Sequence, residues 1–271
     1  MEKRIRICAD DYGIAPGVSQ AIRALIEARR INATSVMTLF PGLKEEAGRL
    51  SEAAQGSGAS LGLHLTLTGG FAPLAAAPLG GSVLPSMGGL TAGAFSGRLR
   101  RAAVAAEVEA QFAAFIEAFG HAPDHVDGHQ HAHLLPGIRT ILLEATRRHA
   151  PAAWVRDCVP APGARLGFDL KGRIIGAFST GLKKAAAEKG LSVNKGFAGA
   201  YAFRKGVAFE PLLARFVAGL PDKGLMMVHP GFVDEVLATR DSLVVLREAE
   251  YEVLAGPAFP EILKTAGARL M

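Results

Sequence analysis

The sequence predicts an α/β protein in which short parallel strands alternate with helices, in a sheet that is either open or closed into a barrel. Short apolar runs recur along nearly the whole chain, and most are followed by segments with apolar residues three or four positions apart. The chain has 271 residues, 49% of them hydrophobic, which is enough for one large core. We therefore expect a single domain spanning residues 1–271.

The first half of the chain contains three such units. Charged and β-branched residues alternate over residues 3–9, which predicts a strand, and helical spacing predicts a helix at 17–26. A second strand is expected at 34–40, where a Pro-Gly pair stops it, and a helix at 43–54. The apolar run 60–65 predicts a third strand with a histidine near its end.

The second half continues the pattern. Phenylalanine and valine residues three or four apart predict a helix at 104–119. A fourth strand is expected at 124–129 and a helix at 138–148, and apolar runs at 152–155 and 225–228 predict two more strands. These repeated units favour a parallel sheet with helices packed against it.

Residues 69–97 interrupt the alternation. Gly, Pro, Ala and Ser dominate this segment and no helical period is visible, so we expect a long loop. Loops of this length inside compact domains are usually functional or disordered. A lid that faces the substrate and a solvated linker are the two interpretations.

Composition excludes several classes of protein. The net charge of +5 is spread along the chain, and the short basic cluster at residues 98–101 lacks interleaved aromatic residues, so nucleic-acid binding is not expected. Cys8 and Cys158 lie far apart in apolar surroundings, which predicts buried thiols rather than a metal motif or a disulfide framework. Without a signal-like segment or a run of about 18 apolar residues, we expect a soluble cytoplasmic protein with no membrane span. A homodimer is the commonest oligomer to anticipate.

Polar side chains follow the predicted strands, at the point where each strand ends. In parallel barrels these ends gather on one face of the molecule, so residues over two hundred positions apart would converge there. The candidates are Asp10, Asp11, His64, Asp127, His129, His131, His133, Arg156 and His229.

The histidine cluster indicates a metal site. His129, His131 and His133 would share a face in an extended chain, whereas a helical turn would align only the first with the third. Imidazole and carboxylate groups bind Zn²⁺ and other divalent ions, and about three protein ligands leave room for water. Such an ion lowers the pKa of bound water, and a nearby free carboxylate can take the proton. Asp10 and Asp11 could supply a ligand and a base separately.

Simpler explanations exist for single residues. Asp10 or Asp11 could cap the helix that follows, although capping does not explain two carboxylates at the end of a buried strand. His64 alone could be a hydrogen-bonded core residue, and His229 could belong to a turn. Arg156 could pair with a nearby surface carboxylate. Polar residues recur at the ends of successive predicted strands, and this recurrence favours a functional site over separate structural roles.

The motifs "ADDYG", "LGLHLTLT", "HVDGHQHAH" and "HPG" occur in this order and resemble those of the YdjC-like carbohydrate deacetylase family, also called the ChbG/HpnK family. The resemblance implies a distorted parallel (β/α) barrel related to NodB-type polysaccharide deacetylases. It also implies one divalent metal ion, Mg²⁺ or Zn²⁺, and hydrolysis of the N-acetyl group of an amino sugar.

By this resemblance, Asp11, His64 and His129 are the metal ligands. Asp10 is then the general base, and His229 the acid that protonates the leaving amine.

The resemblance leaves other residues with supporting roles. Arg156 is a catalytic candidate that would orient the aspartates or a substrate oxygen, and Asp127 would orient His129 or another ligand. His131 and His133 are left for contacts with the ligands or the substrate. Tyr12 stands where Phe is frequent in the family, and residues 69–100 and 157–205 match poorly, so substrate choice is expected to depend on them.

The expected function is therefore a metal-dependent carbohydrate N-deacetylase acting on an N-acetylglucosamine-containing substrate, either a chito-oligosaccharide or a hopanoid-linked glycolipid. A phosphoesterase is an alternative, but it would usually need two metals and more carboxylates. A non-catalytic metal-binding protein is a third possibility. In that case Asp10 has no role, and Asp10→Asn would be silent.

Overall fold

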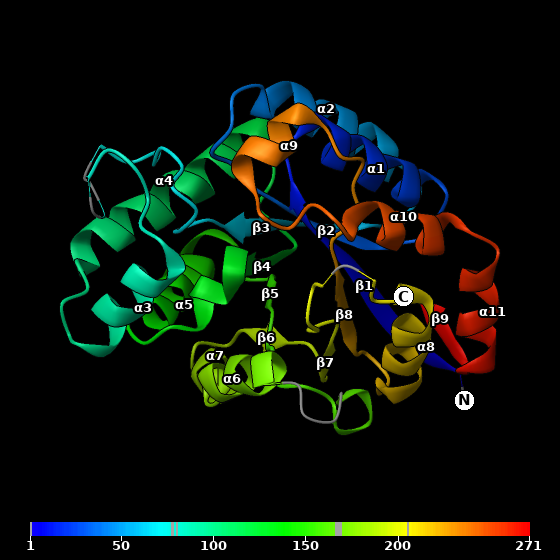
Figure 1. Ribbon diagram of the computed structural model, residues 1–271. Coiled ribbons are helices and arrows are strands. Elements are labelled where there is room, and N and C mark those ends of the chain that lie inside the picture. The colour runs from blue at the N-terminus through cyan, green and yellow to red at the C-terminus, as the bar shows by residue number, and fades with distance from the viewer. Residues whose placement is uncertain (1, 77–78, 80, 166–169, 205) are drawn as a thin grey trace.

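The computed structural model describes residues 2–76, 79, 81–165, 170–204 and 206–271. Its strands form one curled parallel sheet with helices outside it (Figure 1). The order within the sheet is β6-β5-β4-β3-β2-β1-β8-β7, and β9 pairs with the beginning of β1. This confirms the predicted class, an α/β fold built on parallel strands as in a distorted barrel. Among the described residues, no helix is both long and apolar enough to cross a bilayer.

The first half of the chain contains β1 (Lys3–Tyr12), α1 (Pro16–Glu27), β2 (Ala33–Val36), α2 (Leu43–Ala54), β3 (Ser60–Leu65), α3 (Met87–Phe95), α4 (Arg101–Phe119) and β4 (His125–Gly128). A 3₁₀ turn η1 (His129–Leu134), α5 (Ile138–His149), β5 (Trp154–Val155) and a second 3₁₀ turn η2 (Pro162–Ala164) follow. The remaining elements are α6 (Leu170–Ser179), α7 (Leu182–Glu188), β6 (Ser192–Val193), β7 (Phe197–Ala198), α8 (Phe209–Gly219), β8 (Leu225–Val228), α9 (Glu235–Arg240), α10 (Arg247–Ala255), α11 (Ala258–Thr265) and β9 (Ala268–Leu270).

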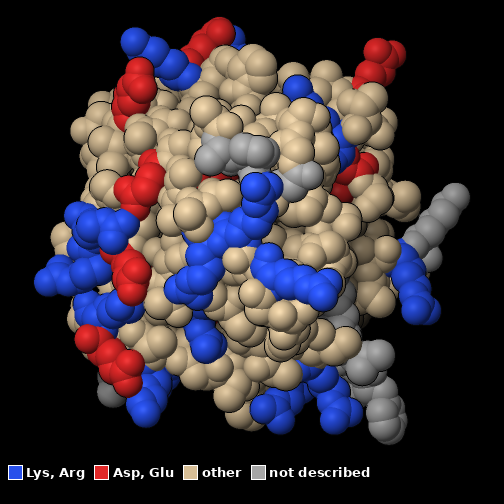
Figure 2. Space-filling view, turned by 90° about the vertical axis from the view of Figure 1, so that its left-hand side faces the viewer, with Lys and Arg blue, Asp and Glu red and all other residues tan. Residues whose placement is uncertain are grey.

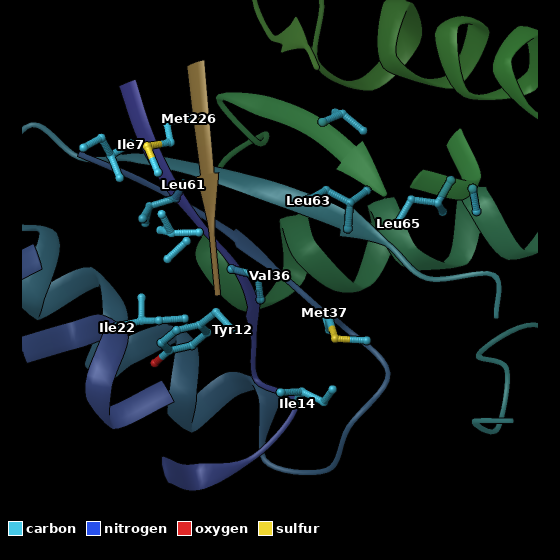
Figure 3. Close-up of a cluster of buried hydrophobic side chains, with 14 of the residues drawn as sticks. Ile7, Tyr12, Ile14, Ile22, Val36, Met37, Leu61, Leu63, Leu65 and Met226 are labelled. Atoms are coloured by element: carbon cyan, nitrogen blue, oxygen red, sulfur yellow. The ribbon is translucent and has the colours of Figure 1, made fainter. Parts of the chain in front are cut away.

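The core explains why the sheet holds its shape. Ile7 of β1, Leu63 of β3 and Met226 of β8 are fully buried, and α1 packs Ile22 beneath the same sheet (Figure 3). Each such side chain contributes roughly 1.5–3 kcal/mol when it is removed from water. Cys8 and Cys158 are buried free thiols, as predicted. The strands therefore present their carboxyl ends from a rigid base.

The expectation that 69–97 lacks a helix was wrong. Helix α3 lies within this segment, and its first turn is capped by the Ser86 side chain, which accepts a hydrogen bond from Gly89 N at 3.2 Å. No helical period is visible in the sequence because Leu90 is the buried residue of α3, while most of the helix faces outward. Residues 77, 78 and 80 of this segment lie outside the described residues.

The second strand is shorter than expected and ends at Val36 rather than at residue 40. Its parallel pairing with β1 stops there, and Phe40 packs edge-on against Phe71, with ring centroids 5.0 Å apart. The chain thus leaves the sheet after Val36, and Phe40 packs on Phe71 outside the strand.

The first strand is longer than expected and includes both aspartates. The pairing of β1 with β2 shifts register between Ala9 and Tyr12, and Asp11 adopts a left-handed backbone with φ of 68°. The capping explanation is wrong, because helix α1 begins after Ala15 without a side-chain cap. Instead, Asp234 accepts a hydrogen bond from Gly17 N at 2.7 Å. The two aspartates are therefore held at an irregular strand end.

Candidate active site

Polar residues at or just after the carboxyl ends of β1, β3, β4 and β8 converge on one cavity of about 1110 Å³. This convergence was predicted from the parallel topology. The cavity wall includes Asp10, Asp11, His64, His129 and His229.

Asp11 is the centre of a carboxylate-histidine cluster. One oxygen, Oδ1, lies 3.2 Å from His64 Nε2 and 3.0 Å from His129 Nδ1. The other, Oδ2, accepts a hydrogen bond from Arg247 at 2.7 Å. Burial alone would raise the pKa of this carboxyl, but Arg247 and the hydrogen bonds from the two histidines hold it well below the usual range. Asp11 is therefore a carboxylate.

The second ring nitrogen of His64 is fixed from behind. Its Nδ1 lies 2.6 Å from Asp127 Oδ1 and 3.0 Å from the Ser35 hydroxyl. Burial favours the neutral ring, but the Asp127 charge and the hydrogen bonds raise the pKa of His64 to about 10. Asp127 thus orients the ring of His64 rather than that of His129, and directs Nε2 of His64 toward Asp11.

Asp10 is held by a different cation. Arg156 donates to both of its oxygens, each at 2.6 Å, and also pairs with Asp127. Burial is the largest influence on Asp10 and raises its pKa despite Arg156. Arg156 is fully buried and lies behind the cavity wall, so it orients Asp10 and does not pair at the surface.

The histidine cluster adopts neither of the two predicted geometries. Gln130 and His131 have φ of 52° and 59° inside the 3₁₀ turn, so the three rings diverge. His129 reaches Asp11, and His131 lies on the cavity wall with Nδ1 3.6 Å from Cys158 Sγ. His133 is fully buried and donates to the Arg156 carbonyl at 3.0 Å. His133 therefore supports the strand end that carries Arg156.

His229 follows β8, and its ring lies edge-on against Phe203 at 5.1 Å. Its backbone N–H donates to Glu250 Oε2 at 2.5 Å, and the Tyr201 hydroxyl donates to Glu250 Oε1 at 2.5 Å. Burial raises the pKa of Glu250 to about 7. This carboxyl fixes the backbone from which the His229 ring projects.

Sequence reasoning missed Arg247 and Glu250. Both are buried on α10, on the same side as Leu254. The sequence contained a sign of this burial. Glu250 follows Arg247 by three positions and Leu254 follows Glu250 by four, which are the spacings at which a helix normally buries apolar residues. Charged residues at core spacing indicate buried partners.

The donor set of Asp11, His64 and His129 fits a divalent ion. Their ligand atoms lie within 4.8 Å of one another, and all three side chains are buried. Separations of 3.0–3.2 Å from Asp11 Oδ1 match those between ligands that each bind one ion at about 2.0–2.2 Å. Two other groups among the described residues contain Asp127, which already pairs with the buried Arg156. The Arg156 guanidinium already supplies the positive charge beside Asp127, so these two groups do not fit a metal ion.

A curled parallel sheet with carboxylates and imidazoles at its strand ends defines an α/β barrel fold with a candidate metal centre. A peptidoglycan N-acetylglucosamine deacetylase, Bc1960, shares this fold with a TM-score of 0.50 and 10% identity, over 99% of this chain and 85% of that one.

The family model described as "YdjC-like protein" matches residues 4–265, and the chain belongs to this family. It is 30% identical to the chitooligosaccharide deacetylase of Yersinia enterocolitica, over 100% of this chain and 98% of the relative. A crystal structure from Enterococcus faecalis V583, of a candidate cellobiose-phosphate cleavage protein, has a TM-score of 0.76 and 18% identity. That match covers 100% of this chain and 97% of the other.

Proposed function

We propose that the protein is a metal-dependent hydrolase that removes the N-acetyl group from an N-acetylglucosamine-containing substrate. One observation carries the proposal: two adjacent carboxylates face one cavity with different partners. Asp11 belongs to the donor set with His64 and His129, whereas Asp10 is outside it and is held by Arg156. A ligand and a separate base are what metal-assisted hydrolysis requires. The name of the Yersinia relative supports the same chemistry.

Asp11, His64 and His129 would hold the ion. Two imidazoles with one carboxylate favour Zn²⁺, and Mg²⁺ is the alternative. When bound, the ion supplies Lewis-acid polarisation of the acetamide carbonyl and lowers the pKa of water.

The chain's own residues move the protons. Asp10 accepts a proton from the attacking water, and the two-pronged contact with Arg156 keeps its carboxylate aimed into the cavity. His229 gives a proton to the departing amine, and Glu250 holds its backbone in position. Arg156 is thus a positioning residue rather than one that touches substrate.

The cavity walls support a substrate with an apolar part. Helix α3 contributes Met87, and α6 contributes Ile174, Ile175 and Phe178. Such walls favour a glycolipid, as in the hopanoid-linked case, and a chito-oligosaccharide is the other candidate. Segment 69–97, which carries α3 to this wall, would act as the lid.

The test is acetate release from diacetylchitobiose and from an N-acetylglucosaminyl lipid by the protein loaded with Zn²⁺ or Mg²⁺. We expect Asp10→Asn to lower kcat by about 10²–10⁴-fold with one equivalent of metal still bound, as expected for removal of a general base. Asp222→Asn, a change at an exposed carboxylate, is the matched control and should retain activity.

Full activity in Asp10→Asn would contradict the proposed mechanism. Hydrolysis of a phosphoester without acetate release would replace the proposal with a phosphoesterase. Metal binding without turnover of either class would indicate a non-catalytic metal-binding protein.

A further inference from the structure

We propose that the face of the molecule beside the cavity mouth docks on an anionic bilayer surface, so that a lipid-linked substrate can enter the cavity from the membrane. This inference rests on the proposed function. The docking face is defined by Phe95, Arg98, Arg101, Arg139, Ile174 and Lys183.

Positive charge predominates on the side of the mouth formed by α3 and α6. The two segments that carry α3 and α6, residues 69–106 and 170–187, contain no aspartate or glutamate. Their charged residues are Arg98, Arg100, Arg101, Lys171, Arg173, Lys183 and Lys184. Figure 2 shows a group of basic side chains in the centre of this side of the molecule, with acidic side chains toward its left edge. In the described part of the chain, no carboxylate forms an ion pair with Arg98, Arg101, Arg139 or Lys183.

The basic residues lie close enough to form a continuous belt. The Arg101 guanidinium packs against Gly137, just before α5: a Cβ atom added to this glycine would lie 3.1 Å from Nη1 of Arg101. Arg139, two residues further on, donates to the Thr180 carbonyl at 2.9 Å, at the end of α6. Lys183 follows on α7 and is exposed. The belt therefore runs from the end of α3 past α5 to α7.

Apolar side chains accompany the belt at the mouth. Phe95 is 58% exposed and Ile174 is 46% exposed. The Phe95 ring lies 5.5 Å from that of Phe178, which lines the cavity together with Ile174. Basic residues beside exposed apolar ones are typical of segments that bind anionic lipid headgroups and insert into the acyl boundary. A nucleic acid or another polyanion would use the charges but not the apolar pair.

The experiment measures co-sedimentation of the full chain with vesicles of phosphatidylcholine alone or of an equimolar mixture with phosphatidylglycerol. We expect binding to the anionic vesicles only, and weaker binding as salt rises. Arg98→Glu/Arg101→Glu should weaken it by about 30-fold or more, because each basic side chain near an anionic surface contributes about fivefold. Phe95→Ser should weaken it by about tenfold.

Lys44→Glu/Lys264→Glu is the matched control. It removes two exposed basic residues from α2 and α11 and should leave binding within about twofold. Equal binding to neutral and anionic vesicles, or equal losses in both double variants, would overturn the docking face. So would an unchanged affinity in Phe95→Ser together with equally tight binding to heparin.

Acetate release from diacetylchitobiose separates this inference from the proposed function. Arg98→Glu/Arg101→Glu should retain that activity, because neither residue lines the cavity. Release of acetate by a protein that binds no vesicles overturns the docking face alone. Vesicle binding without release from any acetylated substrate overturns the proposed function and removes the reason given for docking.

Discussion

Replacing Arg156 with Met should strongly destabilise the protein. In the native structure its guanidinium lies between two buried carboxylates, with contacts of 2.6 Å to both Asp10 oxygens and an ion pair to Asp127. Removing one partner of a buried ion pair costs about 3–5 kcal/mol, because the remaining charge is left without compensation. Here two carboxylates lose their shared cation. We expect the free energy of unfolding to fall by at least about 3 kcal/mol at pH 7 and Tm by about 6–12 °C.

The loss should depend on pH with a defined sign. Without Arg156, the folded state favours protonation of Asp10, whose pKa burial already raises. A carboxyl whose pKa is higher in the folded than in the unfolded state stabilises the protein at low pH and loses this effect as pH rises. The destabilisation in Arg156→Met should therefore be smaller at pH 5 than at pH 8.

The assay is urea unfolding in the presence of a chelator, followed through the fluorescence of Trp154, the single tryptophan of the chain. Arg4→Met is the control, since Arg4 forms an exposed ion pair with Asp222, and such pairs contribute at most about 1 kcal/mol. Arg156→Met/Asp10→Asn should recover part of the loss. A destabilisation below about 1 kcal/mol, or one independent of pH, would refute the reasoning from burial and charge.

Three further predictions concern neighbouring groups. Asp127→Asn should weaken Zn²⁺ affinity by about 10–100-fold in a chelator competition titration, because His64 loses its orienting carboxylate; unchanged affinity would contradict this role. Burial raises the pKa of Glu250 to about 7, so ionisation of this carboxyl should lower the stability of the wild type by about 3 kcal/mol as pH rises from about 4.5 to above 7. Urea titrations of Glu250→Gln should show a smaller dependence of stability on pH. An unaltered dependence would show that other groups dominate it. Gly62→Ala should lower stability by about 1–3 kcal/mol, since its Cβ would lie 2.3 Å from His125 Nε2 in the packed core; an unchanged urea midpoint would show that the ring moves aside freely.

The convergence of the site could be predicted from the sequence because it depends on local patterns. Apolar runs located β3 and β8, and parallel strands bring their carboxyl ends to one face. His64 and His229 could therefore be expected in the same cavity as Asp11 although the chain separates them widely.

The partners that hold the site could not be predicted in the same way. Arg247 contacts Asp11 across 236 positions, and nothing in the local sequence of α10 specifies that contact. The left-handed backbone of Asp11 and His131 could not be predicted either, because only a few per cent of residues other than glycine adopt it and the sequence does not mark which ones do. Helix α3 was not predicted because it buries few side chains, so its apolar residues show no helical spacing.

The place of β1 in the sheet has a consequence for protein synthesis. This strand is synthesised before its neighbours β8 and β9, which begin at residues 225 and 268, and Arg247 lies between those two in the sequence. A chain that ends before β8 therefore exposes one edge of β1 and lacks the cation that pairs with Asp11. Deletion of residues 247–271 would remove Arg247 and Glu250 and disable the site, although the site residues named from sequence motifs would all remain.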